Sequence, residues 1–126
     1  MATVLVADDD GPTRLLVRTV LEHAGHAVVE AENGSAALSM AESRRPDLIL
    51  LDLSMPSMGG AEFMRALRIN PLTRSLAAAL YTATPMNAAI RDFIEMYAIA
   101  GVVPKPSEPL ELVSAVDRLL QRTTVS

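Results

Sequence analysis

Short apolar runs that alternate with amphipathic stretches are the feature that most constrains the fold of this chain. Five runs are too short for helices and are bounded by turn residues or rich in branched side chains, so they predict β-strands. These runs cover residues 4–7, 27–31, 48–51, 78–81 and 101–103. Each run is followed by a stretch that favours a helix, most clearly where apolar residues recur at helical spacing. The predicted helices cover residues 12–24, 34–44, 60–70, 90–98 and 109–120.

The alternation of strands with helices predicts a single α/β domain over residues 1–126. Right-handed crossovers place helices on both faces of a parallel sheet, and a sheet covered on both faces requires near-continuous apolar strands. Five such strands favour a doubly wound, flavodoxin-like sheet of order 2-1-3-4-5. Pro104 agrees with this order because a residue without an N–H group is tolerated in an edge strand, which the fifth strand would be.

The composition excludes several classes of protein. Half of the residues are apolar and 21% are charged, as in ordinary globular proteins and unlike disordered chains. The absence of cysteine rules out disulfides and thiolate metal sites and suits the cytoplasm, where we expect the chain to act. No membrane insertion is predicted, because the longest uncharged stretch, residues 75–90, falls short of the ~20 apolar residues of a spanning helix. A net charge of −4 with 3% aromatic residues argues against direct binding of nucleic acid.

Polar residues follow the predicted strands at one edge of the sheet. In a doubly wound sheet the carboxyl ends of the strands point the same way, and ligands bind beyond them where the winding reverses. The first and third strands would be neighbours, so we expect Asp9 and Asp52 to approach each other. The residues at these ends are Asp8, Asp9 and Asp10 after the first strand, Asp52 after the third, Thr82 after the fourth and Lys105 after the fifth.

The expected pair of carboxylates indicates a metal site. Two carboxylates about 4 Å apart repel each other by about 4 kcal/mol at an effective dielectric constant of about 20. Either one of them is protonated or a cation lies between them. Mg²⁺ prefers oxygen ligands and is commonly held by one or two carboxylates together with a phosphate. Mg²⁺ is therefore the expected cofactor.

The neighbouring polar groups predict phosphoryl transfer. An ionised carboxylate attacks phosphorus without a general base and forms an acyl phosphate. Asp52 is the predicted nucleophile because it stands alone after a central strand, while Lys105 and the hydroxyl of Thr82 would neutralise charge on the phosphoryl oxygens. The chain has neither a GxxxxGK[ST] loop nor a GxGxxG turn after the first strand. The expected donor is thus a phosphorylated partner protein or a small acyl phosphate, and not bound ATP.

Four motifs, in this order, resemble the receiver domain of bacterial two-component response regulators. They are Asp8-Asp9, the segment PDLILLDLSMP around Asp52, YTA at Thr82, and Lys105-Pro106. The resemblance covers nearly all of the chain. It implies that Asp52 accepts a phosphoryl group from a histidine kinase or a histidine phosphotransfer protein and loses it by hydrolysis. The chain would then be a phosphoacceptor and not an enzyme, and a downstream effector domain or protein would read its state.

The resemblance also implies a ligand set. Asp9, Asp52 and the backbone carbonyl of Ser54 would bind Mg²⁺, with Asp8 acting through water. The peptide bond between Lys105 and Pro106 would be cis, as is typical of the family.

The chain departs from the receiver pattern in the region that transmits the signal. Receivers often carry an aromatic residue three positions before the lysine, where this chain has Val102. Many have Phe after the Lys-Pro pair, where this chain has Ser107. Neither departure touches the phosphorylation chemistry. Ser54 and Thr84 occupy positions that the family uses to tune dephosphorylation.

Two alternatives stay open. The segment DDDGPT resembles the DxDGT opening of haloacid dehalogenase-like phosphatases, in which Asp8 would be the nucleophile and Asp10 a general acid. Those enzymes need a further acidic motif after a later strand, whereas no acidic residue lies between Glu62 and Asp92. The other alternative is a pseudo-receiver, a non-phosphorylated interaction module of the same fold. One of Asp8, Asp9 and Asp10 also suits a structural role as the N-cap of the first helix.

Overall fold

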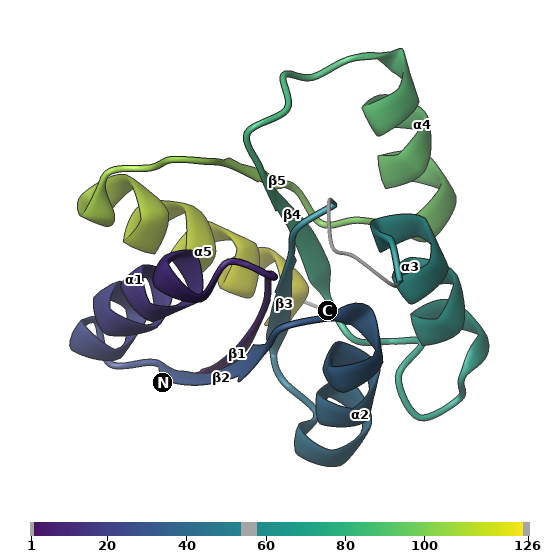
Figure 1. Cartoon of the computed structure of the whole chain (residues 1–126), viewed down its shortest axis with the longest axis horizontal. Helices are drawn as coiled ribbons and strands as arrows, with labels where there is room; N and C mark the ends of the chain where they lie inside the picture. Colours follow the sequence, from purple (N-terminus) through teal and green to yellow (C-terminus); the bar gives the residue numbers. More distant parts are fainter. Residues whose placement is uncertain (1, 54–57, 125–126) are drawn as a thin grey trace.

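The computed structural model describes residues 2–53 and 58–124, and within them the predicted alternation of strands and helices is observed (Figure 1). The strands are β1 Thr3–Ala7, β2 Ala27–Ala31, β3 Leu48–Leu51, β4 Ala78–Thr82 and β5 Val102–Pro104. The helices are α1 Gly11–His23, α2 Gly34–Arg44, α3 Gly60–Ile69, α4 Ala88–Tyr97 and α5 Pro109–Thr124. The largest difference from the prediction is at the end of α5, because polar residues lengthen a helix without adding to its apolar pattern.

The five strands form one parallel sheet of order β2-β1-β3-β4-β5, which confirms the predicted fold class. β1 and β3 are neighbours, with Ala7 opposite Leu51 at their carboxyl ends. β5 is an edge strand, and Pro104 lies opposite Thr82 of β4. The carboxyl ends of β1, β3, β4 and β5 therefore lie side by side. The residues at these ends form the carboxyl edge of the sheet, as distinct from its outer strands.

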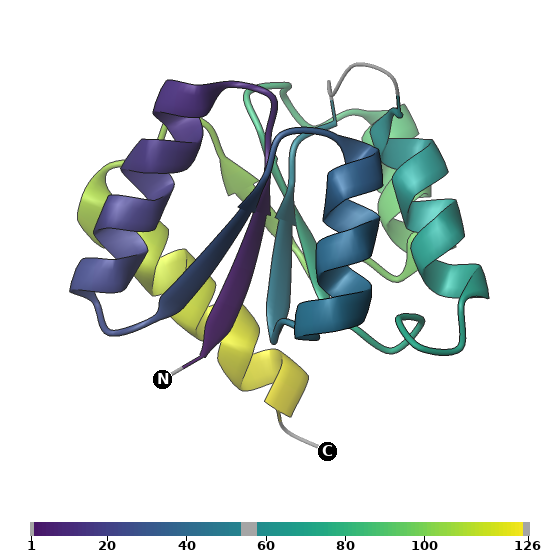
Figure 2. The same cartoon turned by 60° about the horizontal axis from the view of Figure 1, so that its bottom comes forward.

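Helices cover both faces of the sheet (Figure 2). α1 and α5 pack on one face, and α2, α3 and α4 pack on the other. Neighbouring residues of a strand point to opposite faces, so each strand contributes to both cores. The first face carries Val4, Val6, Val28, Leu48, Leu50, Ala79, Tyr81 and Val103 from the strands, and the second carries Leu5, Ala7, Val29, Ala31, Ile49, Leu51, Ala78 and Leu80.

Side-chain caps fix where three of the helices begin. The carboxylate of Asp10 accepts a hydrogen bond from the Thr13 N–H at 3.0 Å and starts α1. Asn33 and Asn87 cap α2 and α4 in the same way. Such caps satisfy N–H groups that have no partner within the helix.

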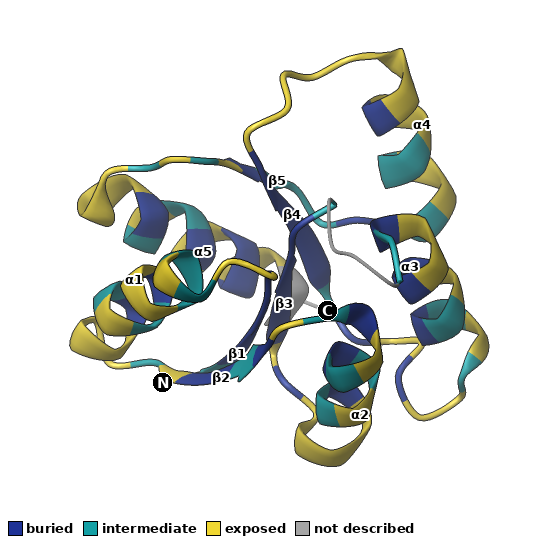
Figure 3. Ribbon diagram, in the orientation of Figure 1, coloured by how far each residue is buried: buried dark blue, intermediate teal, exposed yellow. Residues whose placement is uncertain are grey.

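Burial follows the sheet and the inward faces of the helices (Figure 3). The helices are amphipathic, and their outward faces are polar or only sparsely apolar. Within residues 2–53 and 58–124, no helix combines the length and the apolar character that crossing a bilayer requires.

Candidate functional site

Three aspartates gather at the carboxyl edge of the sheet. Asp8 and Asp9 follow β1 and Asp52 follows β3, and one carboxylate oxygen from each lies within 4.8 Å of the others. The expected approach of Asp9 to Asp52 is therefore observed. Asp8 and Asp52 are only 1% and 7% exposed, whereas Asp9 is exposed to solvent. The group thus has two sheltered carboxylates and one that faces solvent.

Lys105 supplies a positive charge to this group. Its Nζ lies 2.6 Å from Oδ2 of Asp8 and 3.7 Å from Oδ2 of Asp52. Burial lowers the pKa of Lys105, but the hydrogen bond to Asp8 and the charges of Asp52 and Asp8 outweigh burial, so the pKa is raised above its ordinary value. The ammonium also lies 5.4 Å from the ring centre of Tyr81, a buried residue of β4. Lys105 is therefore protonated at neutral pH.

The remaining charge fits a divalent cation. The group contains three carboxylates, and one ammonium lies beside two of them, so when ionised it keeps an excess of two negative charges. All of the clustered ligand atoms are carboxylate oxygens, which hard cations such as Mg²⁺ prefer. The predicted fourth ligand, the carbonyl of Ser54, lies outside the described residues. The donor set that is described, Asp8, Asp9 and Asp52, suits Mg²⁺.

Thr82 lies at the same edge, at the end of β4. It is buried, and its hydroxyl oxygen accepts a hydrogen bond from the Thr84 N–H at 3.1 Å. Its backbone carbonyl accepts a hydrogen bond from the N–H of Lys105, which ties the ends of β4 and β5 together. Accepting a hydrogen bond uses a lone pair of the hydroxyl oxygen and leaves the hydroxyl proton as a donor. The peptide bond between Lys105 and Pro106 is cis, as the resemblance implied.

Asp10 is not part of the group of clustered carboxylates. Its Oδ2 accepts hydrogen bonds from the backbone N–H and the hydroxyl of Thr13. These bonds hold the pKa of the Asp10 carboxyl below its ordinary value of 3.8. Asp10 is thus the one of the three adjacent aspartates that caps α1, and the general-acid role of the phosphatase alternative finds no support in its position.

Replacing Asp10 with alanine is expected to lower the stability of the domain at neutral pH and to leave phosphorylation intact. A lowered pKa contributes stability that is present above the ordinary value of 3.8 and is lost as the pH falls through the lower, folded value. The stability difference between the parent protein and Asp10→Ala should therefore shrink as the pH falls below 3.8. Urea unfolding at neutral and acidic pH measures this difference in the free energy of unfolding. Asp10→Asn is the control, because Asn is also a good N-cap and should retain stability without this pH dependence.

Two contacts at the site involve residues to which the sequence assigned no role. Arg14 in α1 donates from Nη1 to the backbone carbonyl of Asp8 at 2.7 Å and from Nε to Glu30 at 3.0 Å. Tyr81 lies beside Lys105. Arg14 is one of several arginines in α1 and α2, and Tyr81 belongs to an apolar run that predicts a β-strand. Neither therefore carries a signal in the sequence that separates it from its neighbours.

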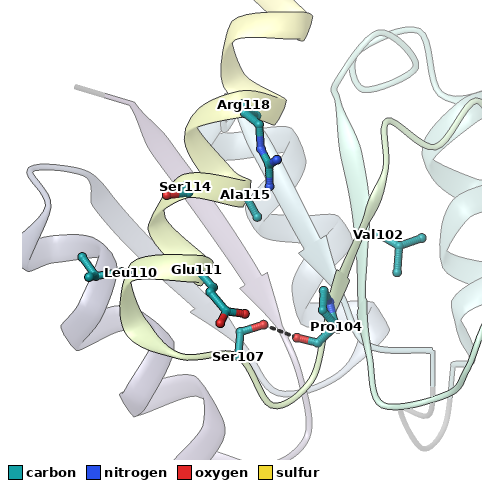
Figure 4. A pocket seen from close by; sticks show the side chains of 8 residues that line it. All are labelled: Val102, Pro104, Ser107, Leu110, Glu111, Ser114, Ala115 and Arg118. Atoms are coloured by element: carbon teal, nitrogen blue, oxygen red, sulfur yellow. Dashed lines mark hydrogen bonds between the residues drawn. The ribbon is translucent and has the colours of Figure 1, made fainter.

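A pocket of about 440 Å³ lies between β5 and α5, and its lining includes none of the clustered aspartates (Figure 4). Val102 and Ser107, the two departures from the receiver pattern, both line it. The hydroxyl of Ser107 donates to the carbonyl of Pro104 and so closes the turn after β5. The acidic edge of the sheet and this pocket are thus separate features, and the chemistry predicted from the sequence belongs to the acidic edge.

Comparison with known proteins gives concordant matches. The family model described as the response regulator receiver domain matches residues 4–117. The chain is 36% identical over 121 residues to the phosphate regulon transcriptional regulatory protein PhoB of Pseudomonas aeruginosa, an alignment that covers 96% of the chain and 52% of PhoB. It is 37% identical to an uncharacterized 14.6 kDa protein of Leptolyngbya boryana, covering 91% of the chain and 87% of that protein. The chain thus spans about half the length of PhoB.

Solved structures agree with this result. The chemotaxis response regulator CheY4 of Vibrio cholerae superposes with a TM-score of 0.86 at 30% identity, covering 94% of the chain and 98% of CheY4. A putative response regulator from Chloroflexus aurantiacus superposes with a TM-score of 0.85, also at 30% identity, covering 96% of the chain and 98% of that structure.

Proposed function

The chain belongs to the response regulator receiver family of two-component systems, and from this premise we propose that Asp52 is its phosphoryl acceptor. The donor would be the phosphohistidine of a histidine kinase or of a histidine phosphotransfer protein. The observation that carries the proposal is the group of carboxylates of Asp8, Asp9 and Asp52 with the ammonium of Lys105 among them. Under this proposal the chain is a phosphoacceptor and not an enzyme that acts on a separate substrate.

In the proposed reaction a carboxylate oxygen of Asp52 attacks phosphorus. The bond from phosphorus to the imidazole nitrogen of the donor breaks, and an acyl phosphate forms on Asp52. Later attack of water on phosphorus returns the carboxylate and releases inorganic phosphate. Both steps depend on positioning and on neutralising charge at the phosphoryl oxygens.

The neighbouring residues supply that neutralisation. Lys105 lies 3.7 Å from Asp52 and would donate to a phosphoryl oxygen, and the hydroxyl proton of Thr82 would do the same. Asp8, Asp9 and Asp52 would hold Mg²⁺, with Ser54 as the ligand that the receiver resemblance adds. When bound, Mg²⁺ would offset the negative charge of the phosphoryl group.

The output and the location of the chain are part of the proposal. The Pseudomonas relative is named a transcriptional regulatory protein, and the chain spans about half of its length. We infer that the phosphorylated chain acts on an effector domain or on a separate effector protein. A cytoplasmic location stays a prediction.

The test is to identify the residue that becomes phosphorylated. The purified chain would be incubated with acetyl phosphate and Mg²⁺, and the modified residue mapped by mass spectrometry. We expect a phosphoprotein that hydroxylamine cleaves, as expected for an acyl phosphate, with the modification at Asp52 and with none formed when the metal is chelated. Modification of any other residue, or phosphorylation that is unaffected by chelation, would contradict the proposal.

A further inference from the structure

The end of β1 is held by contacts from two directions. The N–H of Asp8 donates to the carbonyl of Ala31 at 3.1 Å, as an extension of the β1–β2 pairing. The carbonyl of Asp8 accepts from Nη1 of Arg14 at 2.7 Å. Nε of Arg14 donates to Glu30 at 3.0 Å, and Glu30 lies on the face of β2 that α1 covers. Arg14 is only 17% exposed, so this bridge between β2 and the end of β1 is sheltered from water.

The carbonyl of Asp8 matters because it belongs to the same planar peptide unit as the N–H of Asp9. Once the direction of this oxygen is fixed, the position of the Asp9 Cα relative to β1 is fixed too. The N–H of Asp10 donates to Oδ1 of Asp8 at 2.9 Å and restrains the next peptide unit. Asp9 is exposed, so its neighbours in the chain must supply the order that burial gives to Asp8 and Asp52.

We propose that Arg14 is a positioning residue: by holding the carbonyl of Asp8 it presents the Asp9 carboxylate to Mg²⁺, without touching the metal itself. The proposal rests on the function proposed above, because it assumes that Mg²⁺ binds to this group of aspartates. The planar guanidinium of Arg donates in two fixed directions, here to a carbonyl and to a carboxylate, which a lysine ammonium on a flexible stem does not reproduce.

The charge of Arg14 and its proposed positioning role predict opposite changes in Mg²⁺ affinity when Arg14 is replaced by a neutral residue. Arg14 carries a positive charge close to the acidic residues, and its charge helps to lower the pKa of Asp10. If that charge were all that mattered, replacing Arg14 with methionine would strengthen the binding of a cation. If positioning dominates, the same replacement weakens it. Arg14→Lys keeps the charge and removes only the two-directional geometry.

Arg18 provides a matched control in the same helix. Its Nη1 pairs with the other oxygen of Glu30 at 3.0 Å and its Nε pairs with Glu22 at 3.1 Å, but no contact from Arg18 to Asp8 is observed. Arg18→Lys therefore perturbs the same ion-pair network without releasing the carbonyl of Asp8. A loss that is confined to the Arg14 variants identifies the Asp8 contact as its cause.

The experiment measures Mg²⁺ affinity by calorimetry for the parent protein, Arg14→Lys, Arg14→Met and Arg18→Lys, each shown to be folded by circular dichroism. We expect about a 10-fold loss of affinity in both Arg14 variants, the low end of the effect of residues that orient metal ligands. For Arg18→Lys we expect less than about a twofold change, as for a partly exposed ion pair. Equal losses in Arg14→Lys and Arg18→Lys, or tighter binding by Arg14→Met, would overturn the proposal.

A second readout needs no metal. Amide hydrogen exchange at Asp8 and Asp10, whose N–H groups donate to Ala31 and to the Asp8 carboxylate, should be faster in metal-free Arg14→Lys than in the parent protein and unchanged in Arg18→Lys. If the parent protein binds no Mg²⁺, the metal part of the proposed function fails, and this exchange measurement alone decides whether Arg14 orders the segment. Unchanged exchange in Arg14→Lys would overturn the proposal even if Mg²⁺ binds normally.

Discussion

Replacing Asp52 with asparagine is expected to abolish phosphorylation of the chain by acetyl phosphate in the presence of Mg²⁺. Asn has nearly the same volume as Asp, so the buried position after β3 keeps its packing, but a neutral amide lacks the nucleophilic oxygen of a carboxylate. We expect a loss of at least about 100-fold in the rate of phosphoprotein formation, as for other residues that form the new bond themselves. Intact mass spectrometry over a time course measures this rate.

Two further aspartate variants make the result specific. Asp10→Asn removes a neighbouring carboxylate but keeps the side-chain cap of α1 that accepts from the Thr13 N–H. This variant should be phosphorylated like the parent protein. Asp8→Asn separates the receiver from the phosphatase alternative, in which Asp8 is the nucleophile. Phosphorylation that persists in Asp52→Asn and disappears in Asp8→Asn would transfer the role to Asp8. A parent protein that is never phosphorylated would favour the pseudo-receiver.

The fold could be predicted from the sequence because its strands are apolar on both faces. Leu5 and Val6 are adjacent in β1, yet they pack in different cores on opposite sides of the sheet. Runs of this kind require helices on both faces, and the alternating order of elements then leaves few topologies. The position of Pro104 agreed with the edge position of β5.

The edge at which the site lies could be predicted for the same reason, but its internal contacts could not. Strand order places Asp9 and Asp52 together whatever their side chains do. By contrast, the flexible side chain of Lys105 reaches more than one carboxylate, and only the folded backbone decides that it lies closer to Asp8 than to Asp52. The sequence indicates a proton or a metal ion as the partner of the acids, whereas their pairing with this ammonium is seen only in the folded structure.

Lys105→Met is expected to destabilise the metal-free domain, because it leaves the carboxylate of Asp8 buried without its positive partner. Asp8 is 1% exposed and its Oδ2 lies 2.6 Å from the lysine Nζ. Removing one member of a buried ion pair costs about 3–5 kcal/mol. The side chain of Lys105 is 21% exposed, so water can partly replace it, and we expect a loss of about 2–3 kcal/mol in the free energy of unfolding.

Urea unfolding with and without Mg²⁺ tests the origin of this loss. A ligand that binds only the folded state stabilises it by RT ln(1 + c/Kd), where c is the free ligand concentration, so at a given concentration the gain is larger for the protein that binds it more tightly. A divalent cation that takes over the missing positive charge should therefore stabilise Lys105→Met more than it stabilises the parent protein. The control is Arg91→Met in α4, which removes one exposed positive charge and should change stability by less than about 0.5 kcal/mol. An equal gain from Mg²⁺ in all three proteins would contradict this explanation.

The titration of Lys105 provides an independent check, since it is the only lysine in the sequence and gives a single side-chain signal in lysine-labelled NMR spectra. Its pKa is raised, so the stability that it contributes is fully present below the ordinary value of 10.5 and is lost as the pH rises through the higher, folded value. The stability difference between the parent protein and Lys105→Met should therefore stay constant from about pH 6 to about pH 9. A lysine signal that titrates below 10.5 would show that burial outweighs the carboxylates, and the predicted destabilisation would then have to be smaller.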